Sequence, residues 1–315
     1  MMFKSKKRIA LFIVSIVLVA SVLYQAICVN NYTEVPGKII EVNNHDMHIF
    51  ATGKREDKPV IVITAGSGTT TLYADFYPLY NKLEKENRVV VYERPGYGYS
   101  EKTERSRDID TVVSELHALL IESDEKPPFI LVGHSMGALE SIRYAQLYPN
   151  EIEGLVFIDG ISPEYAQNFE MDIGMKVSWH TMNTAKNIGI LRTLSLFGIM
   201  DNVFIDIPNL PKELQELKIS MALKNTNNRN MKEELEWMSR NGKKVIEQGD
   251  LGTLPVLQFS ATNNGYENWE KTQNELLKIS SRTEQVIFPN TKHYIHHEKA
   301  HEINERIKSW IGELQ

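Results

Sequence analysis

A serine with the spacing of a nucleophile lies in the pentapeptide Gly-His-Ser-Met-Gly at 133–137, centred on Ser135. The apolar run 129–132 comes directly before it, and the helix-forming segment 138–145 follows directly. In a tight turn between a strand and a helix, a serine hydroxyl stands clear of the backbone, and the helix N-terminus offers N–H groups to a developing oxyanion. Glycines suit both flanks because a Cβ there would collide with the neighbouring strand and helix. The pattern therefore predicts that Ser135 is a nucleophile.

A base must accompany such a serine, because its hydroxyl is a poor nucleophile at neutral pH. His293 follows the last strand-like apolar run, 284–288, and can reach the sheet edge where Ser135 is expected. There it would take the serine proton on attack and return it to the leaving group. The sequence thus predicts acyl transfer with Ser135 and His293 as catalytic residues.

The elements that must position these residues alternate along most of the chain. Runs such as 59–64 are apolar throughout, which is typical of strands covered on both faces. Strands are predicted at 38–42, 47–51, 59–64, 88–92, 129–132, 154–158, 254–260 and 284–288. Helices are predicted at about 71–85, 107–123, 138–145, 269–279 and 298–314. This alternation predicts an α/β fold with a mostly parallel, doubly wound sheet.

Composition narrows the class of protein. The 315 residues are 42% hydrophobic and 24% charged, which is ordinary for a globular chain with a sizeable core. The net charge of −6 argues against a nucleic-acid partner. Cys28 is the single cysteine, so no disulfide can form within the chain. Composition leaves the oligomeric state open.

The N-terminus departs from a soluble pattern. A basic stub at 1–8 precedes an uncharged run at 9–29, and 30–36 reads as a linker. A helix over 9–29 would be about 30 Å long, enough to cross a bilayer core. Because the basic cluster precedes the run, we expect a single-pass signal anchor with its N-terminus cytoplasmic and the remaining chain outside. The alternative is a signal peptide whose cleavage releases a secreted protein.

The segment 162–250 interrupts the alternation with helical spacing alone. We predict a helical cap there, inserted in a core formed by 37–161 and 251–315. The segment is rich in methionine, at positions 171, 175, 182, 200, 221, 231 and 238. Methionine adapts its shape, so these side chains either line a pocket for an apolar substrate or pack as ordinary helix core.

Taken together, the motifs resemble those of the α/β-hydrolase superfamily over nearly all of the chain after the anchor. The pentapeptide at 133–137 matches the family's nucleophile elbow. The segment Tyr-Glu-Arg-Pro-Gly-Tyr-Gly-Tyr-Ser at 92–100 is similar to its Y-D-x-P-G-x-G-x-S turn, with glutamate for aspartate. Ala-Gly-Ser-Gly at 65–68 stands where the family has a His-Gly oxyanion loop, and His293 followed by Glu298 resembles its histidine loop. The resemblance implies an α/β-hydrolase fold with a helical cap.

The resemblance also assigns the remaining site residues. The oxyanion would bind the backbone N–H groups of Met136, just after the nucleophile, and of Ser67 in the first loop. The family usually places its acid in the loop after the strand at 254–260, where this chain has Ala-Thr-Asn-Asn-Gly. In some relatives the acid follows the strand after the elbow helix, and that position is Asp159 here. We expect Asp159 to be the acid, with Glu267 and Glu270 as the alternatives.

A second motif, H-E-x-x-H, is formed by His297 and His301 around Glu298. On one helix two histidines at this spacing can share a zinc ion, but a third protein ligand is needed. No G-x-x-H continuation follows, and the α/β-hydrolase resemblance already accounts for the segment. The sequence therefore predicts solvated helix-face histidines, and neither a metal nor a cofactor.

These observations predict a membrane-anchored serine hydrolase that cleaves a lipid-like or small apolar ester. A peptidase or amidase on the same scaffold is the nearest alternative, because the catalytic residues do not fix the leaving group. A haloalkane dehalogenase or epoxide hydrolase is disfavoured, since those relatives have aspartate where this chain has Ser135. The alternative from another class is a non-catalytic binding protein, suggested by the altered oxyanion loop and the missing acid after 254–260.

Overall fold

The computed structural model describes residues 2–29, 34–55, 58–199 and 207–314. Within these ranges, one sheet of eight strands has the order β1-β2-β4-β3-β5-β6-β7-β8. Strand β2 is antiparallel to β1 and β4, and every pairing from β4 onward to β8 is parallel. The strands are β1 (Lys38–Val42), β2 (His45–Thr52), β3 (Val60–Thr64), β4 (Val89–Glu93), β5 (Phe129–His134), β6 (Ile152–Ile158), β7 (Val256–Ala261) and β8 (Thr283–Phe288). The predicted mostly parallel sheet is confirmed.

Helices cover both faces of this sheet. One face carries α4 (Ile109–Glu122), α5 (Met136–Leu147) and α12 (Trp269–Leu276), and the other carries α2 (Leu72–Asp75), α3 (Tyr77–Leu83) and α14 (Ala300–Leu314). Buried side chains alternate along the strands: Val60 and Val62 belong to the first core, and Ile61 and Ile63 to the second. Apolar runs without polar alternation are therefore explained by burial on both faces.

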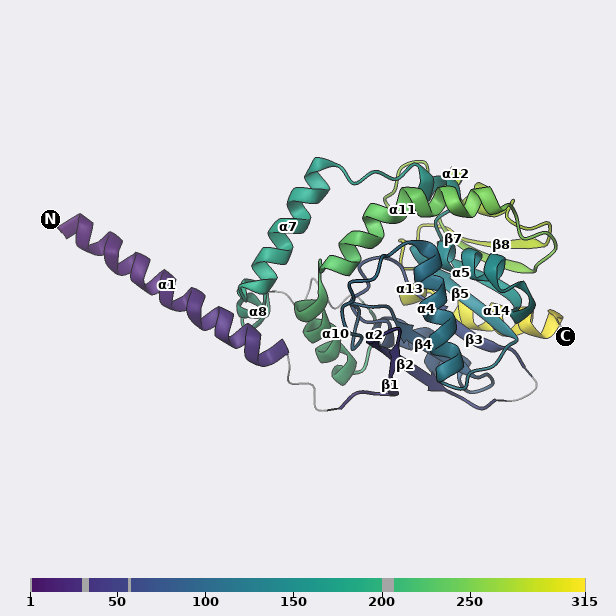
Figure 1. Cartoon of the computed structure of the whole chain (residues 1–315), viewed down its shortest axis with the longest axis horizontal. Helices are drawn as coiled ribbons and strands as arrows, with labels where there is room; N and C mark the ends of the chain where they lie inside the picture. Colours follow the sequence, from purple (N-terminus) through teal and green to yellow (C-terminus); the bar gives the residue numbers. More distant parts are fainter. Residues whose placement is uncertain (1, 30–33, 56–57, 200–206, 315) are drawn as a thin grey trace.

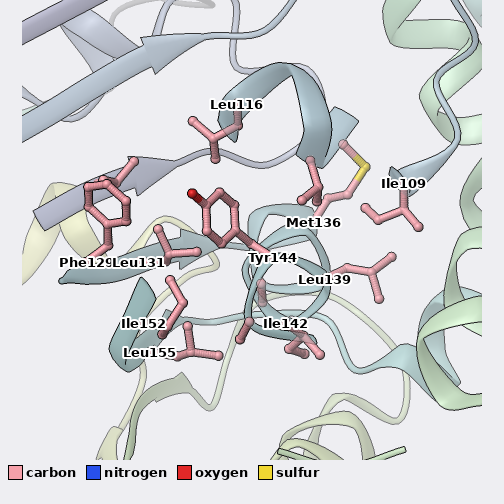
Figure 2. Packing of buried hydrophobic residues seen from close by; sticks show 14 of the residues in the cluster. Ile109, Leu116, Phe129, Leu131, Met136, Leu139, Ile142, Tyr144, Ile152 and Leu155 are labelled. Carbon is pink, nitrogen blue, oxygen red and sulfur yellow. The ribbon is translucent and has the colours of Figure 1, made fainter. Parts of the chain in front are cut away.

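The core around α5 fixes the turn at its start. Figure 2 shows Leu116 of α4 near Tyr144 of α5, with Leu131 of β5 and Met136 in the same packing. All four side chains are buried, with Met136 8% exposed. Residues on both sides of Ser135 are thus held by close packing.

Two predicted helices are interrupted. The helix expected at 71–85 is divided into α2 and α3 at Phe76, whose backbone angles (φ −95°, ψ 6°) are not helical. The helix expected at 298–314 begins earlier as α13 (Ile295–Glu298), and Lys299 separates it from α14. Phe76 is fully buried, so its packing outweighs local helix propensity there.

The segment predicted as a cap contains α6 (Pro163–Gln167), α7 (Ile173–Asn187), α8 (Ile190–Ser195), α10 (Lys212–Asn225) and α11 (Arg229–Gln248), and no strand among its described residues. The remaining elements are α1 (Met2–Val29) and the 3-10 helix η1 (Pro149–Glu151). In Figure 1, α7, α8 and α10 lie between α1 and the sheet. Of the cap methionines, Met221 and Met231 are fully buried, and Met200 lies outside the described residues.

Helix α1 extends away from the sheet, and its C-terminal half contacts α8 (Figure 1). Ser21 bonds Thr193, and Gln25 accepts a bond from Arg192. Among the helices in the described ranges, none combines the length and apolar character that a membrane crossing requires. The signal anchor at 9–29 therefore stays a prediction. Several of its side chains lie outside the described residues, as do residues 30–33 of the expected linker.

Candidate active site

Ser135 occupies the turn between β5 and α5 with φ 53° and ψ −121°. This backbone conformation is strained for a residue with a Cβ, and strain of this kind is retained where the surroundings enforce it. A Cβ on Gly133 would lie 2.6 Å from the Gly137 carbonyl carbon, and one on Gly137 would lie 2.6 Å from the Thr64 carbonyl oxygen. The two flanking glycines therefore let β5, α5 and β3 approach one another closely. Ser135 itself is half-buried at this turn.

His293 and Asp159 come together from loops that follow different strands. His293 Nδ1 lies 2.7 Å from Asp159 Oδ2, and both side chains are buried. Asp159 directly follows β6, and His293 lies between β8 and α13. No hydrogen bond joins Ser135 to His293 among the described residues. Without substrate such bonds are often long and tighten only in the complex.

Three further donors hold the Asp159 carboxylate. The Ala261 amide and Trp269 Nε1 each donate to Oδ1 over 2.9 Å, and Asn264 Nδ2 donates to Oδ2 over 3.0 Å. A buried carboxylate needs this many partners because leaving it unpaired is costly. Glu267 and Glu270 are exposed, and neither of these described side chains bonds His293.

The two amides predicted to form the oxyanion hole come from the loop after β3 and from the first residue of α5. Ser67 follows Gly66, where a Cβ would lie only 2.8 Å from Ser135 Cβ, so this loop passes close to Ser135. Met136 begins α5. In the described part of the chain neither the Ser67 nor the Met136 amide donates a hydrogen bond. Both donors are therefore available to a ligand.

Arg94 connects this loop to α5 and to the cap. Its Nη2 donates to the Gly66 carbonyl over 3.0 Å, which orients the peptide unit that contains the Ser67 amide. Its other nitrogens contact Glu140 of α5 at 3.1 Å and Glu234 of α11 at 3.3 Å. Burial raises the pKa of Glu140, although the charge of Arg94 opposes that change. The loop, the elbow helix and the cap thus share one buried cation.

His134 packs behind the nucleophile. Its Nε2 lies 3.2 Å from the His293 carbonyl, and its ring is 4.7 Å from that of His293 between centroids. Burial, followed by the neighbouring His293 and His296, holds the pKa of His134 well below its usual range. A neutral, buried imidazole at this place supports the His293 loop.

Two hollows lie near the core, and neither is lined by Ser135. One of about 620 Å³ is lined by residues such as Ile152, Thr253 and Pro255, at the N-terminal ends of β6 and β7. Parallel sheets bind ligands at the opposite edge, so this hollow is away from the chemistry. A second, of about 450 Å³, is lined mainly by residues that follow β7, which include Asn264 and Trp269.

Sequence reasoning missed Trp269, Asn264 and Arg94 as parts of this site. Trp269 and Asn264 are separated from Asp159 by more than 100 positions. Arg94 lies in the turn at 92–100 that carried the resemblance, so its position was a usable signal. Trp269 and Asn264 carried no such signal in the sequence, because their hydrogen-bond partner is brought near only by the fold.

Comparison with known proteins agrees with the observed fold. A family model described as alpha/beta hydrolase fold matches residues 58–300. The uncharacterized protein YbdG of Bacillus subtilis (strain 168) is 29% identical over 228 residues, which are 72% of this chain and 69% of that protein. YqjL from the same organism is 26% identical over 261 residues, covering 81% and 85%. The crystal structure of bromoperoxidase from Bacillus anthracis superposes with a TM-score of 0.65 at 19% identity, covering 87% of this chain and 99% of that one.

Proposed function

Because this chain belongs to the alpha/beta hydrolase family, we propose that it is a serine hydrolase that cleaves a carboxylic ester through an acyl-enzyme. The observation that carries the proposal is the 2.7 Å hydrogen bond between His293 and Asp159 beside the strained turn of Ser135. A nucleophile, a base and an orienting carboxylate on adjacent loops are what acyl transfer requires.

The reaction follows from these positions. Ser135 Oγ attacks the ester carbonyl carbon while His293 Nε2 takes the hydroxyl proton. The carbonyl oxygen becomes negative and accepts bonds from the Ser67 and Met136 amides. His293 then protonates the leaving alkoxide, and a water activated by His293 hydrolyses the acyl-enzyme. Asp159 holds the Nδ1 proton and stabilises the imidazolium.

The proposed substrate is an apolar acyl ester, either lipid-like or small. The proposed site of the reaction is a membrane to which α1 attaches the protein. Support comes from exposed apolar side chains on α1, which include Phe12, Ile16, Val19, Leu23 and Ile27. Exposed apolar side chains also lie on the cap, where Val177, Leu196 and Phe197 are exposed by 60, 64 and 75%. In the proposed orientation the basic stub is cytoplasmic and the catalytic part is outside.

The direct test is labelling of the full-length, detergent-solubilised protein with a fluorophosphonate, followed by peptide mass spectrometry. We expect one adduct on Ser135, abolished in Ser135→Ala and at least about 100-fold slower in His293→Ala. Turnover of matched p-nitrophenyl esters and anilides would then separate an esterase from an amidase. Folded wild-type protein that forms no adduct would overturn the serine mechanism and favour a non-catalytic binding protein.

A further inference from the structure

Three side chains that commonly bind metals meet behind the catalytic loops. Asp75 ends α2, while His296 and His297 belong to α13. Asp75 Oδ2 lies 3.4 Å from His296 Nε2 and 3.2 Å from His297 Nε2. The three ligand atoms lie within 4.8 Å of one another, and all three residues are buried. None of them takes part in the proposed ester hydrolysis.

The two distances from the carboxylate oxygen to the imidazole nitrogens, 3.4 and 3.2 Å, match the separation of neighbouring ligands around a small tetrahedral ion. Zinc binds imidazole nitrogen and carboxylate oxygen at about 2.0–2.2 Å, which places neighbouring ligand atoms about 3.3 Å apart. We propose that Asp75, His296 and His297 form a three-ligand site for Zn²⁺ or a similar divalent transition metal. A water molecule would complete the tetrahedron.

The surroundings prepare the ligands for one geometry. Lys218 of α10 lies 2.7 Å from Asp75 Oδ1, so it occupies the carboxylate oxygen that faces away from the histidines. Phe76 stacks on the His296 ring with centroids 4.3 Å apart and planes 8° apart. Both contacts restrict the orientations that the Asp75 carboxylate and the His296 ring can adopt. The Lys218 charge opposes a cation, so it weakens the site while fixing the carboxylate.

This site is different from the H-E-x-x-H motif in the sequence. His297 and His301 lie on different helices, because Lys299 (φ −118°, ψ 23°) interrupts them. His301 is exposed on α14, as the sequence predicted, whereas His297 is buried, contrary to that prediction, and contacts His296 and Asp75. His301 is therefore a matched control: it has the same side chain, it lies four positions away, and it is outside the proposed site.

A metal here would connect three parts of the enzyme. Asp75 follows the loop that contains Ser67, and His296 lies three positions after His293. Through Lys218 the site also contacts α10 of the cap. The role we assign is structural: the ion keeps the oxyanion loop and the histidine loop at a fixed separation. The assignment does not depend on ester hydrolysis, so it can hold or fail separately.

The test uses full-length protein freed of metal with a chelator and titrated with Zn²⁺ by calorimetry. We expect one equivalent to bind, with affinity lowered at least about 100-fold in Asp75→Asn and His297→Asn and unchanged in His301→Asn. Lys218→Met should bind more tightly, because a neighbouring positive charge is removed. Should the ligand variants fail to fold, Co²⁺ added to the wild type would still report tetrahedral nitrogen and oxygen ligation through its visible absorption. Absence of stoichiometric binding, or equal loss in His301→Asn, would overturn the site and leave a buried His–Asp ion pair.

Discussion

Asn264 donates a hydrogen bond to Asp159 across 3.0 Å, from the loop where related hydrolases usually have the acid itself. The loop after β7 therefore still serves the carboxylate, but as a donor. Ala261 and Trp269 come from the same stretch and donate to the other oxygen. Three hydrogen bonds therefore tie the Asp159 carboxylate to the end of β7, to the loop after it and to the start of α12.

Removal of the Asp159 charge should strongly reduce turnover. In Asp159→Asn the amide can favour the wrong tautomer of His293, and kcat should fall on the order of 10³-fold. Steady-state hydrolysis of a p-nitrophenyl ester measures this change. KM should move little, since the carboxylate does not contact substrate.

Returning the acid to the loop should restore part of that loss. Asn264→Asp in the Asp159→Asn background places a carboxylate beside the original position, and we expect kcat to rise about 10-fold over the single variant. Asn264→Asp alone would set two carboxylates side by side and should lower kcat. If the double variant is no faster than Asp159→Asn, the two positions are not interchangeable.

Trp269 should affect catalysis through its indole N–H. Trp269→Phe keeps an aromatic ring beside His293 but removes the donor to Asp159 together with part of the indole ring, so kcat should fall about 10-fold. The same substitution in Asp159→Asn should have almost no further effect, because the indole then lacks its charged partner. Equal losses in both backgrounds would mean that Trp269 acts by packing alone.

The sheet and the turn that carries Ser135 could be predicted from sequence because their signals are local. The run 129–132, the flanking glycines and Ser135 are contiguous, and their burial pattern appears directly in the residue types. The position of His293 could be predicted for a similar reason, because this residue follows an apolar strand and precedes a helix.

The supporting contacts could not be predicted, because each depends on partners brought together by the fold. Asp75 and His297 are separated by 222 positions, and nothing near either residue indicates the other. The break at Lys299 likewise places the two histidines of the H-E-x-x-H motif on different helices. Local propensity predicted a continuous helix there, and tertiary packing overruled it.

Loss of Arg94 should destabilise the fold. Arg94→Met leaves Glu140 and Glu234 buried without their cation, and the free energy of unfolding should fall by about 3 kcal/mol. Urea unfolding followed by tryptophan fluorescence measures it. The control is Lys212→Met, which breaks an exposed pair with Glu216 and should cost no more than about 0.5 kcal/mol.

The buried pair of His48 and Glu93, 2.9 Å apart, should make stability depend on pH. Burial alone would lower the pKa of His48, but the neighbouring Glu93 raises this pKa above 6.5 overall. Burial alone would raise the pKa of Glu93, but His48 and Thr71 lower this pKa below 4.5. The contribution of His48 to the free energy of unfolding is complete below pH 6.5 and is lost as the pH rises through the raised pKa of His48. The glutamate contribution is present above 4.5 and is lost as pH falls through the lowered pKa. The unfolding free energies of wild type and His48→Gln should therefore differ most between pH 4.5 and pH 6.5. A difference that stays constant up to about pH 9 would contradict the pairing.

Membrane attachment through α1 should depend on its apolar surface. Val19 is 60% exposed on this helix, and a lysine near the centre of an inserted helix costs about 2.5–3.5 kcal/mol. Val19→Lys combined with Leu18→Lys should therefore shift the full-length protein from the membrane pellet to the soluble fraction after alkaline extraction. Ile39→Lys, at a comparably exposed apolar position on β1, should leave the protein in the pellet. Wild-type protein found mainly in the soluble fraction would argue against attachment by α1, and the ester-hydrolase proposal would then stand on the Ser135 site alone.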